Sequence, residues 1–102
     1  MVWPPSPSTA QAVYGSIAGT VTDSSGAGAP GASLTITSLD RGTVDTVTSN
    51  ASGYYVKDRL LPGRYELKAE LRGFKTQVVA PVIVGLDTQT KVDPVLEPGK
   101  IT

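Results

Sequence analysis

The fold is decided by one stretch of sequence, Ser52-Gly-Tyr-Tyr-Val-Lys-Asp-Arg-Leu-Leu-Pro-Gly-Arg-Tyr-Glu-Leu-Lys-Ala-Glu-Leu-Arg-Gly-Phe74, which holds two predicted strands and the turn between them. Pro62 fixes φ at about −65°, which suits the first central position of a tight turn. Gly63 supplies the positive φ that a type II turn requires at its next position. We therefore expect a type II turn at residues 61–63.

Apolar and charged side chains alternate strictly after this turn. A period of two places successive side chains on opposite faces of a strand. The segment is therefore predicted to be a half-buried antiparallel strand. One face carries Tyr65, Leu67, Ala69 and Leu71, and the other carries Arg64, Glu66, Lys68, Glu70 and Arg72.

Strand signals recur along the rest of the chain at intervals of about ten residues, which is typical of a β-sandwich. No segment shows helical periodicity beyond about one turn, so the predicted class is all-β. Val44 and Val47 fall on opposite faces of their segment, which indicates an edge strand or a bulge. Pro81 and Pro94 also favour edge positions, because proline cannot donate a ladder hydrogen bond.

The deciding stretch resembles the carboxypeptidase regulatory-like domain family, and the resemblance extends over roughly residues 15 to 99. Two positions depart from the family pattern: Lys57 and Pro94 stand where apolar residues are usual. The resemblance gives structural roles to Gly53, Tyr55, Leu60, Pro62, Gly63, Tyr65, Gly73 and Phe74.

The resemblance implies a single antiparallel β-sandwich of about seven strands, with Greek-key, transthyretin-like (prealbumin-like) topology. It implies no catalytic residues. The variety that the chain looks most like is the N-terminal extension of TonB-dependent outer-membrane receptors. On that basis we expect a disordered Pro/Ser/Ala-rich tail over residues 1–14, the domain over 15–99, and a linker to a missing downstream region over 100–102.

The start of the chain carries a hint of compartment. Ala10-Gln-Ala12 is a small-x-small site like those that signal peptidase cuts. The residues before it contain neither basic residues nor a long apolar run, so they do not form a functional signal peptide. A signal-peptide remnant and an arbitrary tail both remain open. We expect an exported protein, on the periplasmic side of a bacterial outer membrane or extracellular.

Composition excludes several functions. Nine basic and nine acidic residues cancel among the 102, so the basic surplus typical of nucleic-acid binding is absent. The chain has no Cys and no His, which removes thiol nucleophiles, zinc thiolates and histidine bases. Asp87 and Asp93 lack the further acids that calcium requires. We expect no enzyme activity, no cofactor, no metal and no insertion of this domain into the membrane.

One binding residue is a candidate. Tyr54 and Tyr55 are adjacent in a predicted strand, so their side chains must face opposite sides. If Tyr55 is in the core, as the resemblance implies, Tyr54 points outward and could stack on a sugar ring.

The expected function is a non-catalytic accessory or interaction module of a larger exported protein, with a protein partner or a neighbouring domain. The N-terminal periplasmic domain of a TonB-dependent receptor is the preferred form, and its binding would use strand addition at a sheet edge. The alternatives are a carbohydrate-binding module and an accessory domain of a secreted peptidase or other hydrolase. We expect the isolated domain to be a monomer.

Overall fold

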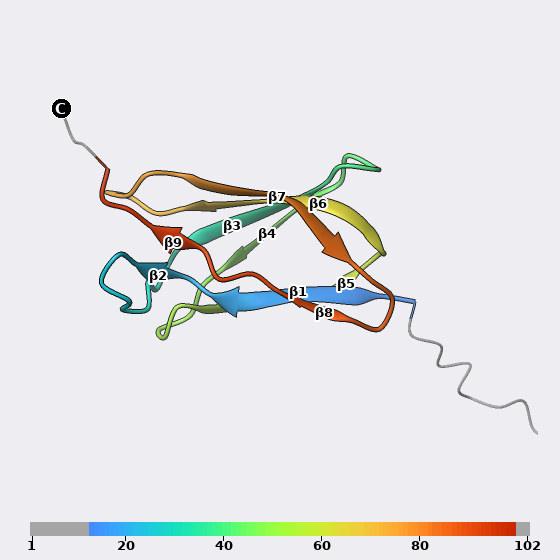
Figure 1. Cartoon of the computed structure of the whole chain (residues 1–102), viewed down its shortest axis with the longest axis horizontal. Helices are drawn as coiled ribbons and strands as arrows, with labels where there is room; N and C mark the ends of the chain where they lie inside the picture. The colour runs from blue at the N-terminus through green and yellow to red at the C-terminus, as the bar shows by residue number, and fades with distance from the viewer. Residues whose placement is uncertain (1–12, 100–102) are drawn as a thin grey trace, which may run out of the picture.

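A computed structural model describes residues 13–99, and this part of the chain is built entirely from strands and the loops between them (Figure 1). Residues 1–12 and 100–102, including the Ala10-Gln-Ala12 site and the predicted linker, lie outside the described residues. The strands are β1 (Gly15–Thr20), β2 (Thr22–Asp23), β3 (Ser33–Ser38), β4 (Val44–Thr48), β5 (Tyr54–Leu60), β6 (Gly63–Glu70), β7 (Gln77–Val84), β8 (Gln89–Lys91) and β9 (Val95–Leu96).

Two sheets face one another as the layers of a sandwich (Figure 1). One layer has the strand order β5-β1-β8 and is prolonged by the short pair β2-β9. The other has the order β4-β3-β6-β7. Only Val21 separates β1 from β2, and residues 92–94 separate β8 from β9, so the nine segments follow seven strand paths. The predicted all-β sandwich of about seven strands is confirmed.

Most pairings are antiparallel, as expected, but two are parallel. These are β1 with β8 and β2 with β9, which join the first and last strand paths of the domain. Parallel neighbours require a long crossover connection rather than a tight turn. Here the strands β3 to β7, which belong to both sheets, form that connection, and the chain then returns to pair with its own first strand.

The core lies between the layers and is filled by every second residue of the strands. In β6, Tyr65, Leu67 and Ala69 are buried while Arg64 and Glu70 are exposed, so the predicted alternation is confirmed. Full burial of a large aliphatic side chain contributes about 1.5–3 kcal/mol. The buried apolar residues are Ile17, Val21, Ala29, Ala32, Leu34, Ile36, Tyr55, Leu60, Tyr65, Leu67, Ala69, Val82, Val84 and Leu96.

The connection at residues 61–63 differs from the predicted type II turn. It carries the chain from β5 in one sheet to β6 in the other, and Gly63 has a φ of +156°, far more extended than the turn requires. The geometry is set by a distant contact: the backbone N–H of Arg64 donates to Oδ2 of Asp40 at 2.9 Å. A Cβ on Gly63 would lie 2.7 Å from that oxygen, so the glycine permits the approach.

Proline and loop chemistry mark the edges of the sheets. Pro81 lies in β7, which is an edge strand whose pairing with β6 shifts register between Tyr65 and Leu67. Pro94 is buried in the break between β8 and β9, also at an edge. The strand that holds Val44 and Val47 is the edge strand β4, and it has no register shift against β3. Among residues 13–99 there is no helix of the length and apolarity needed to cross a membrane.

Candidate functional site

Four of the eight residues with a predicted structural role are buried. Gly53, Tyr55, Leu60 and Tyr65 are buried, whereas Pro62 is exposed. Tyr55 lies opposite Gly19 of β1, and its hydroxyl donates to the carbonyl oxygen of Val92 at 2.6 Å. Burial, and then the negative charge of Asp93, raise the pKa of Tyr55 well above its ordinary value.

Tyr65 fixes the corner between the two sheets. Its buried ring points into the core, and its hydroxyl donates to the carbonyl oxygen of Leu61, four residues earlier. Burial raises the pKa of the Tyr65 phenol. The nearby guanidinium of Arg64 donates to Oδ1 of Asp40 through Nη2 at 2.9 Å, and its backbone N–H also donates to Asp40. These two donors lower the pKa of the Asp40 carboxyl.

Gly73 and Phe74 hold the end of the domain in place. Phe74 is half-buried against the core and forms a backbone bridge with Pro98. The N–H of Lys75 donates to the carbonyl of Glu97 at 2.8 Å, and the N–H of Gly99 donates to the carbonyl of Gly73 at 2.9 Å. The last described residues are therefore tied to the loop between β6 and β7.

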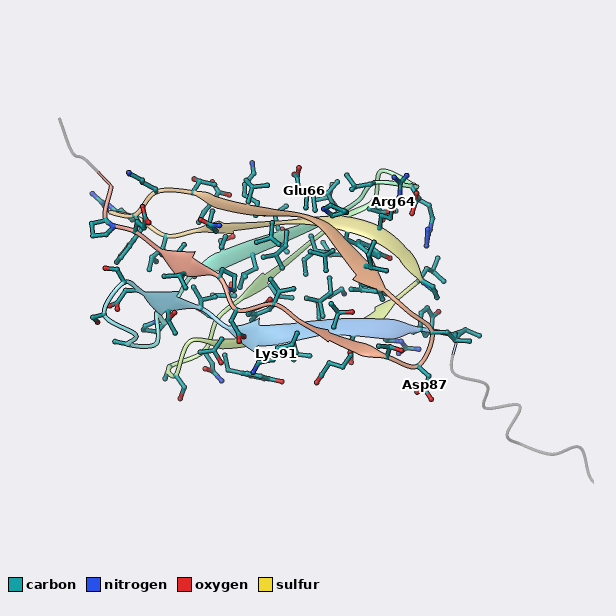
Figure 2. The ribbon with its side chains drawn as sticks, viewed as in Figure 1. Arg64, Glu66, Asp87 and Lys91 are labelled. Atoms are coloured by element: carbon teal, nitrogen blue, oxygen red, sulfur yellow. The ribbon has the colours of Figure 1, made fainter. Side chains whose placement is uncertain are left out.

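Tyr54 points outward from the three-stranded sheet, as expected. It is 43% exposed, and Val56 beside it on the same face is 44% exposed. Thr20 and Ala18 of β1 stand opposite these two residues, and Lys91 follows on the other side of Ala18. Figure 2 shows Lys91 projecting from this sheet away from the other layer. The arrangement exposes one aromatic ring and one aliphatic side chain on the same face of the sheet.

A cavity of about 350 Å³ lies at the pole where β1 begins. Arg59 and Asp87, both of which line it, have left-handed backbone φ values of 58° and 52°. They are the only non-glycine residues with positive φ in the part of the chain that the structure describes. Figure 2 shows Asp87 at this end of the molecule. The lining is Tyr14, Gly15, Ser16, Asp58, Arg59, Asp87, Thr88 and Gln89.

A second cavity, of about 220 Å³, lies between the β3–β4 hairpin and the connection from β5 to β6. We call it the arginine cavity, because Arg41 and Arg59 line it. On this side of the sandwich, Nζ of Lys57 in the edge strand β5 lies 3.8 Å from Oδ1 of Asp45 in the edge strand β4. Lys57 faces inward opposite Ile17, so this departure from the family pattern is accommodated by an ion pair between the sheets. The lining is Arg41, Thr43, Asp45, Arg59, Leu60, Leu61 and Tyr65.

Sequence reasoning missed both cavities. Left-handed φ at Arg59 leaves no sequence signal, because Gly, Asn and Asp are the residues enriched in that region, and a single Asp87 in a loop is too common to mark it. The arginine cavity joins the β3–β4 hairpin to the β5–β6 corner, and no local pattern predicts their contact. Among residues 13–99, no cluster of three His, Cys, Asp or Glu side chains is placed to hold a metal ion.

Comparison with known proteins identifies a sequence family. The model of the family described as carboxypeptidase regulatory-like domain matches residues 16–97. No curated protein matches the chain.

Several solved structures share the fold at low sequence identity. The TIE protein of Bacillus anthracis has a TM-score of 0.72 and 17% identity, over 84% of this chain and 17% of that one. Hydroxyquinol 1,2-dioxygenase from Pseudomonas putida has a TM-score of 0.68 and 12% identity, over 85% of this chain and 57% of the enzyme. A candidate carbohydrate-binding protein from Bacteroides uniformis has a TM-score of 0.66 and 19% identity, over 81% and 41%.

At these identities the similarities show a shared β-sandwich fold. In all three comparisons the chain spans less than two thirds of the other chain's length.

Proposed function

The chain belongs to the carboxypeptidase regulatory-like domain family, whose members are regulatory and non-catalytic, and on this premise we propose that it is an interaction module of a larger exported protein. The specific form that we propose is the N-terminal periplasmic domain of a TonB-dependent outer-membrane receptor. Its work would be to bind a protein partner and to space its neighbours in the parent chain. The isolated domain would be a monomer.

The placement of the two ends carries the proposal. The described chain enters beside the start of β1 at one pole and leaves after β9 at the opposite pole (Figure 1). The termini of a domain often lie close together, which suits insertion into a loop of another domain. Ends at opposite poles suit a module in a linear series, because the length of the sandwich then separates its two neighbours in the parent chain.

The ties at the exit pole support the same interpretation. The backbone bonds from Lys75 to Glu97 and from Gly99 to Gly73 hold the departing chain against the β6–β7 loop. A force or a displacement applied after Gly99 would therefore reach the sandwich through ordered hydrogen bonds. This arrangement suits a domain that works through its attachment to a neighbour.

A titration tests the proposal. The ¹⁵N-labelled domain would be titrated with the purified plug domain of the parent receptor and, separately, with the periplasmic domain of its energy transducer. We expect contiguous amide shifts on one sheet edge or face with at least one of them. Unchanged spectra with both partners at millimolar concentration would contradict the binding role.

Carbohydrate binding is the second candidate, favoured by the outward pair Tyr54 and Val56. An exposed tyrosine ring can stack on the apolar face of a sugar, and the Bacteroides uniformis neighbour shows that a sandwich of this shape occurs in a candidate carbohydrate binder. A glycan panel monitored by NMR would test it. Binding should be lost in Tyr54→Ala and kept in Tyr54→Phe, which retains the ring. A flat response of the unaltered domain to every glycan would remove this function.

A further inference from the structure

The edge strand β4 is the most regular free edge of the sandwich. Its pairing with β3 runs from Ser33 opposite Thr48 to Thr37 opposite Val44 without a register shift. The other edges are interrupted: β7 has Pro81 and a register shift, and β5 has a register shift and the left-handed Arg59. The third, β8-β9, is broken at residues 92–94.

The hydrogen-bond pattern shows which backbone groups of β4 are free to pair. The N–H of Ser38 donates to Thr43, and the N–H of Ser49 donates to Ala32, so the odd-numbered residues of this segment bond toward β3. In an antiparallel ladder, bonded and non-bonded pairs alternate. The N–H and C=O groups of Val44, Thr46 and Thr48 therefore point away from β3, and the side chains of these residues are exposed. These unpaired N–H and C=O groups can bind an extended segment, which would then add a further strand to the sheet.

A strand added beside β4 would direct every second side chain inward, toward the facing sheet. The side chains opposite Val44, Thr46 and Thr48 would lie on the outer surface, and those between them would point inward. The inward position opposite Thr43 lies at the arginine cavity, because Thr43 is part of its lining. One inward side chain of the added segment would therefore enter that cavity.

The charges around the arginine cavity select the kind of side chain. Among its lining residues, Arg41 and Arg59 stand against the single carboxylate of Asp45. Lys57 and Asp40 lie nearby, and Asp40 accepts hydrogen bonds from Arg64. Asp45 already faces Lys57, and Arg41 donates from Nη2 to the carbonyl of Pro62 at 3.0 Å rather than to an acid. The cavity thus has a positive surplus. A carboxylate would find the guanidinium of Arg41 there, whereas the guanidinium of Arg59 stacks over the Tyr14 ring, 5.6 Å from its centroid. Charge-assisted bonds to guanidinium are about twice as strong as neutral ones.

From this arrangement we infer that β4 binds an extended segment of a separate protein by strand addition, with an Asp or Glu side chain anchored in the arginine cavity. A separate protein is favoured because the positive charge of the arginine cavity calls for an acidic side chain on the strand that covers this edge. Residues 1–12 of the same chain do not fit, because they contain three prolines and no acidic residue.

A peptide pair tests the inference. One blocked hexapeptide alternates valine and threonine and carries a glutamate at the end residue that lies opposite Thr43, and its control replaces that glutamate with glutamine. With the glutamate peptide we expect slower hydrogen exchange at the amides of Val44, Thr46 and Thr48. We expect at least about tenfold weaker binding of the glutamine peptide, the effect of one lost charge-assisted contact. Arg41→Gln should remove the difference between the peptides.

A proline variant separates strand addition from other modes of binding. The Thr46 amide points away from β3, so Thr46→Pro removes a docking donor without removing a ladder bond, whereas Thr46→Val keeps both the amide and the branched side chain. Thr46→Pro should lose binding and Thr46→Val should keep it. If the proline variant fails to fold, Arg41→Gln in the unaltered strand still decides the question.

Two outcomes would overturn the inference. One is unchanged exchange at all three β4 amides with either peptide at millimolar concentration, and the other is equal binding of the two peptides. The inference rests on the proposed role as an interaction module. The two can fail separately: a partner that shifts amides elsewhere on the domain would contradict the β4 site and leave the module role intact.

Discussion

The hydroxyl of Tyr55 in β5 reaches across Gly19 of β1 and donates to the carbonyl oxygen of Val92, 2.6 Å away, between β8 and β9. Gly19 leaves the space for this contact, since a Cβ there would lie 1.8 Å from the same oxygen. One side chain thus connects both outer strands of the three-stranded sheet over its central strand. The contact lies at the point where the last strand path is broken by Pro94.

Tyr55→Phe should destabilise the domain by about 1–2 kcal/mol, because it leaves the Val92 carbonyl without its buried donor. Chemical denaturation followed by far-ultraviolet circular dichroism would measure the loss. Tyr54→Phe is the matched control, since that side chain is 43% exposed, and it should change stability by no more than about 0.5 kcal/mol. Equal effects of the two substitutions would show that the Tyr55 bond adds nothing.

Stability should fall at alkaline pH in a manner that depends on Tyr55. Its pKa is raised in the folded state, so above the ordinary tyrosine value of about 10 the unfolded chain releases a proton that the folded chain keeps. The folded state then binds more protons, and its free energy of unfolding decreases as the pH rises. Tyr55→Phe should show a shallower decrease between about pH 9 and pH 12. Parallel pH profiles for the two proteins would refute this assignment.

Gly53→Ala should be much more damaging than Gly42→Ala. Both glycines have positive φ, +85° and +76°, so each substitution carries the left-handed cost of about 1–2 kcal/mol. A Cβ on Gly53 would also lie 2.5 Å from the carbonyl oxygen of Val21, whereas nothing lies within 4 Å of one on Gly42. Urea denaturation should show a larger loss for Gly53→Ala by at least about 1 kcal/mol. Similar losses would mean that the Val21 contact relaxes freely.

The ion pair between Lys57 and Asp45 should contribute little to stability. Its atoms are 3.8 Å apart and its side chains are 27% and 41% exposed, so solvent screens the attraction. A double-mutant cycle with Lys57→Met and Asp45→Asn should give a coupling of about 0–1 kcal/mol. A larger coupling would mean that the pair is a principal tie between the sheets.

Asp40 should stabilise the domain only above acid pH. Hydrogen bonds from the backbone and side chain of Arg64 lower its folded pKa below the ordinary 3.8. The contribution is therefore present above that value and is lost as the pH falls through the folded pKa. The stability difference between the unaltered domain and Asp40→Asn should shrink from pH 7 to pH 2 in thermal unfolding. A difference that does not change with pH would contradict this role.

The alternation of Tyr65, Leu67 and Ala69 predicted β6 correctly, because burial of one face is a property of the strand itself. The outward position of Tyr54 followed from the same periodicity. The type II turn at Pro62 and Gly63 was wrong, because the path there depends on Asp40, more than twenty residues away. Residues 50–53 form Asx bonds, from the N–H groups of Ser52 and Tyr54 to Oδ1 of Asn50, and carry the chain from β4 into β5 of the facing sheet.

The candidate sites were harder to predict than the fold. The arginine cavity is lined by Arg41 from the β3–β4 loop and Arg59 from β5. Each residue alone looks like an ordinary surface charge in a sequence with no net charge. The free edge of β4 is a property of the strand order, which depends on which strands cross between the sheets. The alternation of side chains within one strand can be predicted from the sequence. The order of the strands in the sheets cannot, because it depends on contacts between residues far apart in the chain.

The most direct test of the receptor proposal is to read the coding frame on both sides of this domain in the source DNA. The account predicts that the frame continues downstream into a plug domain and a long series of alternating membrane strands, with an export signal upstream. A frame that ends soon after Thr102, or that enters a hydrolase, would contradict it.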